Sequence, residues 1–120
     1  MKIIFIAGPY YGGGDLRNID KNIREAESFA IALANRGVGF FGPHLHTARF
    51  ELRTIAPEDY YKELDMQILQ RACDALVAIP GWEKSQGARV EVEWAEKNGR
   101  KIFYPKSIDD LEVIVRWAKD

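Results

Sequence analysis

The sequence predicts one α/β domain, a three-layer sandwich in which helices cover both faces of a four- to five-stranded, mainly parallel sheet. Four short apolar runs alternate along the chain with longer stretches whose apolar residues have helical spacing. Strand–helix–strand units of this kind join parallel strands, and a parallel sheet needs helices on both faces. The chain has 120 residues, so a single domain over residues 1–120 is expected.

The first half of the chain begins with an apolar segment, Lys2–Ala7, that is typical of a strand buried on both faces. Gly8–Gly14 is a loop by composition. Asn18–Arg36 has apolar residues at helical spacing and is followed by a glycine, a common helix cap. Val38–Phe41 is expected to be the second strand, and His44–Ala56 shows no clear period.

The second half repeats the alternation. Pro57–Ala72 is expected to be a helix that starts on proline, and Ala75–Ile79 is the third apolar strand. Gly87–Asn98 is the next helix, Lys101–Tyr104 is the fourth strand, and Ser107 begins the last helix. The order is typical of flavodoxin- or Rossmann-like sheets, in which ligands bind at the carboxyl ends of the strands where the strand order reverses.

Charge and cysteine content exclude several classes of protein. With 17 basic and 18 acidic residues and no long basic run, the chain lacks the positive surface that nucleic acids require, whereas one small anion needs only a few donors. The single cysteine, Cys73, excludes an internal disulfide and fits a reducing cytoplasm. The first apolar run is too short to span a membrane. We therefore expect a cytoplasmic protein without nucleic-acid or membrane partners.

Two acidic residues stand out by their helical neighbours. Glu91 has only small or apolar residues three and four positions away, whereas charged side chains surround Glu93 on the same helix. Asp65 lies beside an apolar face, although a solvated pair with Lys62 is an alternative. A carboxylate kept away from water is a competent nucleophile, and burial raises its pKa while a helix N-terminus opposes that rise.

The predicted loops at the strand ends offer further candidates. Ser85 and Gly87 precede the Glu91 helix, and its first amides could hold an anion, although Ser85 is also a common type of helix cap. The loop Gly8–Gly14 matches neither the dinucleotide nor the P-loop pattern, but it could approach a phosphate or sugar closely. Trp82 and Tyr10 could stack on a base or simply pack.

Metal chemistry is not expected. His44 and His46 lie close together in the sequence, but two histidines and one cysteine make a poor metal site.

An ordered set of motifs runs along nearly the whole chain: IAGPYYGGG after the first strand, PH after the second, then DMQILQRACDALVAIPGW, SQGARVEVEWA and KNGRKIFYP. Together they resemble the nucleoside 2-deoxyribosyltransferase superfamily, which includes the deoxyribonucleoside 5′-monophosphate N-glycosidases and small uncharacterised domains. Gly87, Glu91 and Ala95 match the G-x-x-x-E-x-x-x-A pattern of that family's nucleophile helix. Asp65 precedes Glu91 by 26 residues, as suits the family's two catalytic carboxylates.

The resemblance implies cleavage of an N-glycosidic bond with retention and without a metal or organic cofactor. Glu91 would attack C1′ of the deoxyribose, and Asp65 would hydrogen-bond the departing base or protonate it. Water would open the glycosyl-enzyme in a hydrolase, and a second base would open it in a transferase. The residues expected to bind the substrate are Gly8, Tyr10, Gly12, Gly13, Gly14, Arg17, His44, Trp82, Ser85 and Gly87.

Ser85 favours a nucleotide over a nucleoside substrate. Relatives that cleave monophosphates carry a phosphate-binding serine at this place, six residues before the nucleophile, and nucleoside transferases tend to carry an acid. Relatives often assemble as homodimers in which a neighbouring subunit completes the pocket. Because this chain is short, we expect a second subunit to supply any lid over the pocket.

One departure from the family pattern keeps other functions open. Relatives often place a tyrosine in the first strand to orient the nucleophile, whereas this chain has Ile3, Ile4 and Phe5 there, so Tyr10 or Tyr11 would have to take its place. A non-catalytic nucleotide-binding module is therefore an alternative. A plain interaction domain is a third, and it would leave Glu91 exposed.

Overall fold

The structure, a computed structural model, describes all 120 residues and confirms the predicted parallel α/β sandwich. Its four strands are all parallel and lie in the order β2-β1-β3-β4. They comprise β1 (Ile3–Ala7), β2 (Gly39–Phe41), β3 (Ala75–Ala78) and β4 (Lys101–Phe103). The strand order reverses between β1 and β3, so the carboxyl ends of these two strands form the edge where ligands bind in such sheets.

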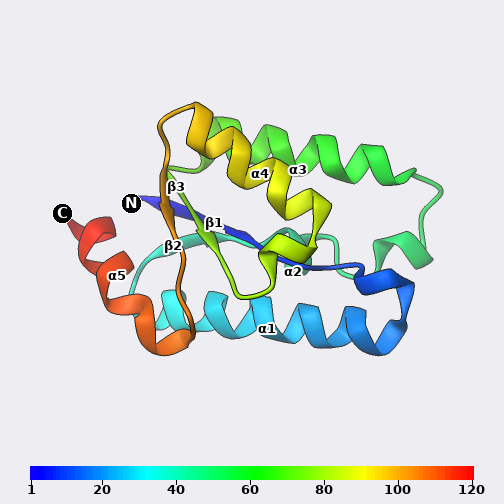
Figure 1. Ribbon diagram of the computed structural model, residues 1–120, viewed down its shortest axis with the longest axis horizontal. Coiled ribbons are helices and arrows are strands. Elements are labelled where there is room, and N and C mark those ends of the chain that lie inside the picture. The colour runs from blue at the N-terminus through cyan, green and yellow to red at the C-terminus, as the bar shows by residue number, and fades with distance from the viewer.

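Helices cover both faces of the sheet (Figure 1). On one face lie α1 (Leu16–Asn35) and α5 (Glu112–Lys119), with the one-turn α2 (Pro43–His46) packed on α1. On the other face lie α3 (Glu58–Ala72) and α4 (Gln86–Lys97). Four 3-10 turns complete the chain: η1 (Gly12–Gly14), η2 (Phe50–Leu52), η3 (Trp82–Lys84) and η4 (Ile108–Leu111).

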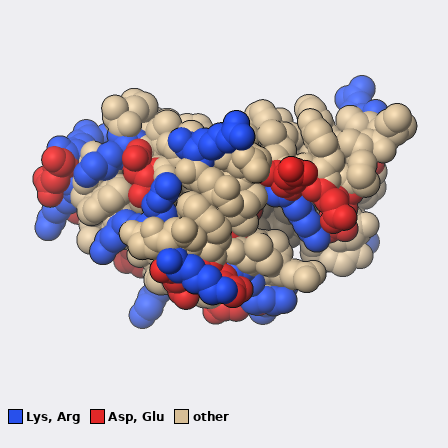
Figure 2. Space-filling model, turned by 90° about the horizontal axis from the view of Figure 1, so that it is seen from above, with Lys and Arg blue, Asp and Glu red and all other residues tan.

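The alternation of side chains along the strands builds two cores. Ile4 and Ile6 of β1 face α1 and α5, whereas Phe5 and Ala7 face α3 and α4. β3 is buried over its whole length, as the apolar run predicted. Seen from the side of α3 and α4, acidic and basic side chains are interspersed on the surface (Figure 2).

Two helices begin earlier than their periodicity predicted because side chains cap them. The carboxylate of Asp15 accepts a hydrogen bond from the Arg17 amide at 2.8 Å, so α1 starts at Leu16 rather than Asn18. Ser85 caps α4 in the same way, and that helix starts at Gln86 rather than Gly87. No helix combines the length and the apolar character needed to cross a bilayer.

The stretch 44–56, expected to be irregular, contains α2 and η2. We call residues 47–57 the crossing segment, because this part of the chain leads from α2, beside α1, over the carboxyl edge of the sheet to α3 on the opposite face (Figure 1). Elements of three or four residues are too short to show a period, which is why the sequence pattern missed them.

Candidate active site

The structure brings Asp65 and Glu91 together across two neighbouring helices. Asp65 lies in the middle of α3, and Glu91 is the sixth residue of α4. They are close enough for the charge of Asp65 to act on Glu91. Both side chains are partly buried, and Oδ1 of Asp65 is fully buried without a hydrogen-bond partner. Glu93 on the same helix is exposed and pairs with Lys97 at 2.8 Å, as its charged neighbours predicted.

The surroundings of the two carboxyl groups oppose their ionisation. Burial raises the pKa of Asp65 to about 7. The pKa of Glu91 lies well above its usual value, mainly because protein atoms surround the group and further because Asp65 is near. The helix dipole does not cancel this rise, since Glu91 lies beyond the first turn of α4, where the dipole acts. The pair therefore retains at least one proton near neutral pH.

No cation compensates either carboxyl group. The alternative that Lys62 pairs with Asp65 is wrong, because Lys62 contacts Glu58 instead, with 3.3 Å between Nζ and Oε1. Glu91 makes no hydrogen bond or ion pair, although it is not the exposed side chain that a plain interaction domain would leave. No cluster of three or more His, Cys, Asp or Glu side chains is placed to hold a metal ion.

The loops that follow β1 and β3 meet at the carboxyl edge. Gly8 is buried, and a β-carbon there would lie 2.4 Å from Cγ1 of Ile79. Gly81 has a left-handed backbone with φ of 91°, and a β-carbon there would lie 3.2 Å from Cγ of Pro9. Glycine is therefore required at both positions, and the two loops lie in contact at the predicted edge.

His44 fixes the backbone at the start of the first loop. Its Nε2 lies 3.1 Å from the carbonyl oxygen of Gly8 and 2.7 Å from that of Pro9, so Nε2 carries the proton that it donates to them. Burial lowers the pKa of His44, which keeps the ring neutral, and Nδ1 is buried without a partner. His44 thus positions the loop through its backbone.

Tyr10 does not reach Glu91. Its hydroxyl donates to the carboxylate of Glu51, and both carboxylate oxygens lie 2.9 Å from the hydroxyl oxygen. The same hydroxyl accepts a hydrogen bond from the Arg49 amide at 2.8 Å. Burial is the main reason that the pKa of Tyr10 rises to about 12. Tyr11 is largely exposed, and its hydroxyl lies beside Gly14. In this structure neither tyrosine replaces the first-strand tyrosine that relatives use.

Ser85 and Gly87 lie at the amino end of α4, between one and two turns before Glu91. The Ser85 hydroxyl oxygen accepts from the Ala88 amide at 3.2 Å, so the residue is a helix cap whose hydroxyl hydrogen is still available to a ligand. The first amides of α4 have no acceptor within the helix, and no bulky group lies over Gly87. Arg89 points elsewhere and donates to the carbonyl of Glu83 at 2.6 Å.

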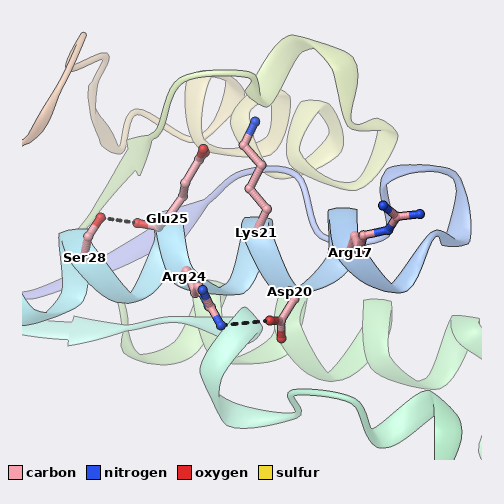
Figure 3. Close-up of a pocket in the computed structure, with 6 residues that line it drawn as sticks. All are labelled: Arg17, Asp20, Lys21, Arg24, Glu25 and Ser28. Atoms are coloured by element: carbon pink, nitrogen blue, oxygen red, sulfur yellow. Dashed lines mark hydrogen bonds and ion pairs between the residues drawn. The ribbon is translucent and has the colours of Figure 1, made fainter.

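The remaining predicted residues lie in two of the 3-10 turns and at the start of α1. The Trp82 ring packs on that of Tyr104, with 5.7 Å between centroids, and on the core beneath α4. Gly12, Gly13 and Gly14 form η1 with positive φ angles. Arg17 lines a shallow groove of about 450 Å³ along α1, together with other charged residues of that helix and with Ser28 (Figure 3).

Several residues that hold this edge together were missed by sequence reasoning. Asn18 and Asn22, one turn apart on α1, donate to the carbonyls of Gly12 and Tyr10 at 3.3 and 3.1 Å. Their spacing directly after a glycine-rich loop was a readable signal. Glu51 carried no such signal, because it lies in a stretch without periodicity.

The fold and these residues define a parallel α/β protein with a carboxyl pair on α3 and α4, the two helices that cover one face of the sheet. The chain belongs to the family described as a domain of unknown function, DUF4406, which matches residues 2–104. The match includes all four strands and α1 to α4, and only η4 and α5 lie beyond it. No curated protein matches the chain significantly. The resemblance to the nucleoside 2-deoxyribosyltransferase superfamily stays a prediction.

Proposed function

We propose that the protein cleaves the N-glycosidic bond of a 2′-deoxyribonucleoside 5′-monophosphate or of the corresponding nucleoside. The observation that carries the proposal is the placement of Asp65 and Glu91 together, partly buried and without a compensating cation. Two such carboxyl groups can divide the roles of acid and nucleophile, because together they hold a proton near neutral pH.

The reaction proceeds by double displacement. Both carboxyl groups favour protonation in the free protein, so the reactive form is the one in which the proton of the pair lies on Asp65 and Glu91 is ionised. A Glu91 oxygen then bonds to C1′ while the C1′–N bond breaks and its electron pair goes to the base. Asp65 gives its proton to the base. Water then attacks C1′, releases Glu91 as a carboxylate and returns a proton to Asp65. The negative charge of Glu91 also stabilises the oxocarbenium-like transition state.

The amino end of α4 supports a phosphate on the substrate. Ser85 and Gly87 precede Glu91 by one to two turns, or about 6–9 Å along the helix axis. In a nucleotide, the deoxyribose separates the 5′-phosphate from C1′ by a distance of the same order. The free amides of α4 and the Ser85 hydroxyl hydrogen face an anion favourably.

The primary experiment follows free base by chromatography while the protein is incubated with a panel of deoxynucleotides and deoxynucleosides. We expect base release by the wild type and a loss of at least about a thousandfold in Glu91→Gln, because the nucleophile is gone. Glu93→Gln is the matched control, since Glu93 is an exposed glutamate on the same helix. No base release from any substrate, with wild type equal to Glu91→Gln, would overturn the proposal.

The same assay distinguishes two alternative functions for this site. If a second base opens the glycosyl-enzyme, adding an acceptor base yields a new nucleoside faster than hydrolysis does. The lack of a tyrosine partner for Glu91 favours the other candidate, a non-catalytic nucleotide-binding module. That candidate predicts a rise in Tm with nucleotide and no turnover.

The proposal also includes a second copy of the chain and a cytoplasmic setting. Leu52 and Ile55 of the crossing segment are largely exposed apolar side chains, which supports coverage by another subunit. Light scattering should report twice the chain mass if a homodimer forms. A single chain mass at assay concentration would contradict the dimer.

A further inference from the structure

We propose that Glu51 and Arg49 are positioning residues for the candidate carboxyl pair. They hold the crossing segment against the loop after β1, and they thereby fix the half of α3 that leads to Asp65. This inference rests on the proposed function, because it gives Glu51 and Arg49 a role around the candidate catalytic pair. The contacts themselves do not depend on any substrate.

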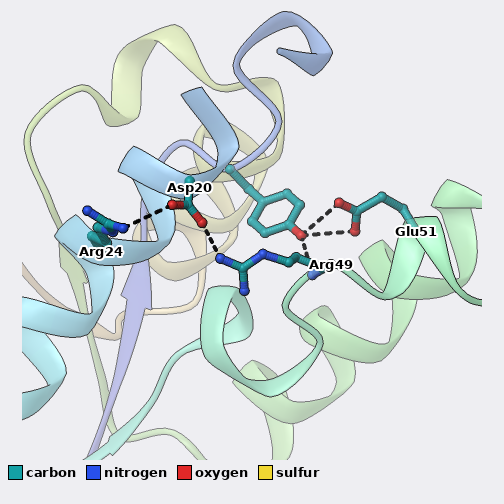
Figure 4. A network of polar contacts seen from close by, with 5 residues as sticks. Asp20, Arg24, Arg49 and Glu51 are labelled. Carbon is teal, nitrogen blue, oxygen red and sulfur yellow. Dashed lines mark hydrogen bonds and ion pairs between the residues drawn. The ribbon is translucent and has the colours of Figure 1, made fainter. Parts of the chain in front are cut away.

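Polar contacts fasten one end of the crossing segment to the first loop and to α1. Glu51 accepts from the Tyr10 hydroxyl, and the Arg49 amide donates to that same hydroxyl. The Arg49 guanidinium pairs with Asp20 of α1, which also pairs with Arg24 (Figure 4). These contacts fasten the beginning of the crossing segment to both α1 and the loop.

The other end of the crossing segment is fastened to α3. The hydroxyl groups of Thr54 and Tyr61 are hydrogen-bonded to each other. Tyr61 lies one turn before Asp65, so a hydrogen bond that holds Tyr61 also limits the movement of the turn that carries Asp65.

The first half of α3 needs this support because the core does not hold it. The α3 residues that pack into the core beneath α3 and α4 all follow Asp65; they are Met66, Ile68 and Leu69, with Cys73 just after the helix. Arg100 also holds only the carboxyl end, by donating to the carbonyls of Gln70 and Cys73. Glu58, Asp59 and Tyr60 are exposed. The contact of Tyr61 with Thr54 is the one side-chain hydrogen bond that ties the first two turns to another part of the chain, since Glu58 and Lys62 pair within the helix.

The backbone conformation of Arg49 indicates that contacts hold the crossing segment in place. It is the only non-glycine residue with a positive φ, at 62°. An arginine rarely adopts this conformation unless its surroundings impose it, and here both its amide and its guanidinium are engaged.

The test compares Tyr10→Phe and Glu51→Ala with the wild type and with Glu63→Ala. The first variant removes one hydroxyl, the second removes its acceptor, and the control removes an exposed carboxylate of α3 that lies beyond the first turn and makes no hydrogen bond or ion pair. The first readout is hydrogen exchange of amides 58–65. The second is the titration midpoint of the Asp65 carboxyl carbon by NMR, which a merely stabilising contact elsewhere would leave unchanged.

We expect exchange of amides 58–65 to accelerate about tenfold or more in both network variants, because local opening costs less. We also expect the Asp65 midpoint to fall from about 7 toward 3.8, since a displaced helix lets water reach the carboxyl group. Glu63→Ala should match the wild type in both readouts. The proposal is overturned if Tyr10→Phe and Glu51→Ala match it too.

The outcome separates this proposal from the proposed function, because neither readout involves a substrate. Shifts in both readouts support the positioning role even if no base is released. If base is released, Glu51→Ala should lower kcat more than it changes KM, since Glu51 acts through Asp65 rather than on the substrate.

Discussion

Asp65 is an acid whose folded surroundings favour its protonated form, and this has a consequence for stability. Its pKa is about 7 in the folded protein against an ordinary 3.8. Between these values the folded state binds more protons than the unfolded state, so this group lowers the free energy of unfolding as pH rises. The loss is complete above pH 7.

We therefore expect Asp65→Asn to become more stable relative to the wild type as pH rises from 5 to 8. The gain should be about 1–2 kcal/mol. This is less than the roughly 2.7 kcal/mol that a fully buried group would give between pH 5 and its pKa of about 7, because the carboxyl group is partly exposed. Urea unfolding at the two pH values measures it. A difference between the two proteins that does not change with pH would contradict the raised pKa.

His44 yields a second prediction at this scale. Because Nε2 faces two carbonyl oxygens and burial lowers the pKa, the ring should be neutral, with its proton on Nε2 at pH 7. Two-bond nitrogen–proton NMR correlations distinguish the tautomers. A proton on Nδ1, or a doubly protonated ring at pH 7, would show that the loop is not held as described.

Single residues show how far sequence reasoning reached. Helical neighbours separated Glu91 from Glu93 correctly, since the structure buries part of the first and exposes the second. The same reasoning could not decide whether Asp65 pairs with Lys62, because either side chain can turn to another partner one turn away. Nor could it place Tyr10, whose hydroxyl finds partners about 40 residues further along the chain.

At the scale of elements, the contact between the β1 and β3 loops depends on the absence of a side chain at Gly8. An added β-carbon would lie 2.4 and 2.7 Å from two atoms of Ile79. We expect Gly8→Ala to cost about 1–3 kcal/mol of unfolding free energy through overpacking.

Adding Ile79→Ala to Gly8→Ala should recover part of that loss, so the two substitutions should be less damaging together than the sum of their separate effects. Urea unfolding of the four proteins gives the coupling free energy. Simple additivity would mean that the two loops are not in contact.

Ser85 tests the amino end of α4 as an anion site. Aspartate at this position still caps a helix but repels a phosphate, so Ser85→Asp should keep its stability while losing preference for monophosphates over nucleosides. Ser85→Ala should instead cost about 1 kcal/mol through the lost cap. The ratio of kcat/KM for a nucleotide and its nucleoside is the measurement, and an unchanged ratio in Ser85→Asp would place the phosphate elsewhere.

Long elements were predictable because their periodicity extends over several turns, as in α1, α3 and α4, and the buried run of β3 was equally clear. Their starts were less so, since Asp15 and Ser85 begin helices through local hydrogen bonds that a periodicity does not contain. The one-turn α2 and η2 left no pattern at all.

For the whole molecule, the sequence predicted the layers and the parallel sheet with its carboxyl edge. It did not predict that residues 47–57 cross that edge, because the crossing depends on contacts between Tyr10, Glu51, Arg49 and Asp20 from distant parts of the chain. The sheet and its helices thus hold the candidate carboxyl pair, the first amides of α4 and the crossing segment within one small domain.

We propose that Glu91 forms a covalent bond to C1′ while Asp65 assists the departure of the base. The most direct measurement is mass spectrometry of the acid-quenched protein during incubation with deoxynucleotides. We expect a deoxyribosyl or deoxyribosyl phosphate adduct on the peptide that contains Glu91, present in the wild type and absent in Glu91→Gln. Base release without an adduct at Glu91, or an adduct that persists in Glu91→Gln, would contradict it.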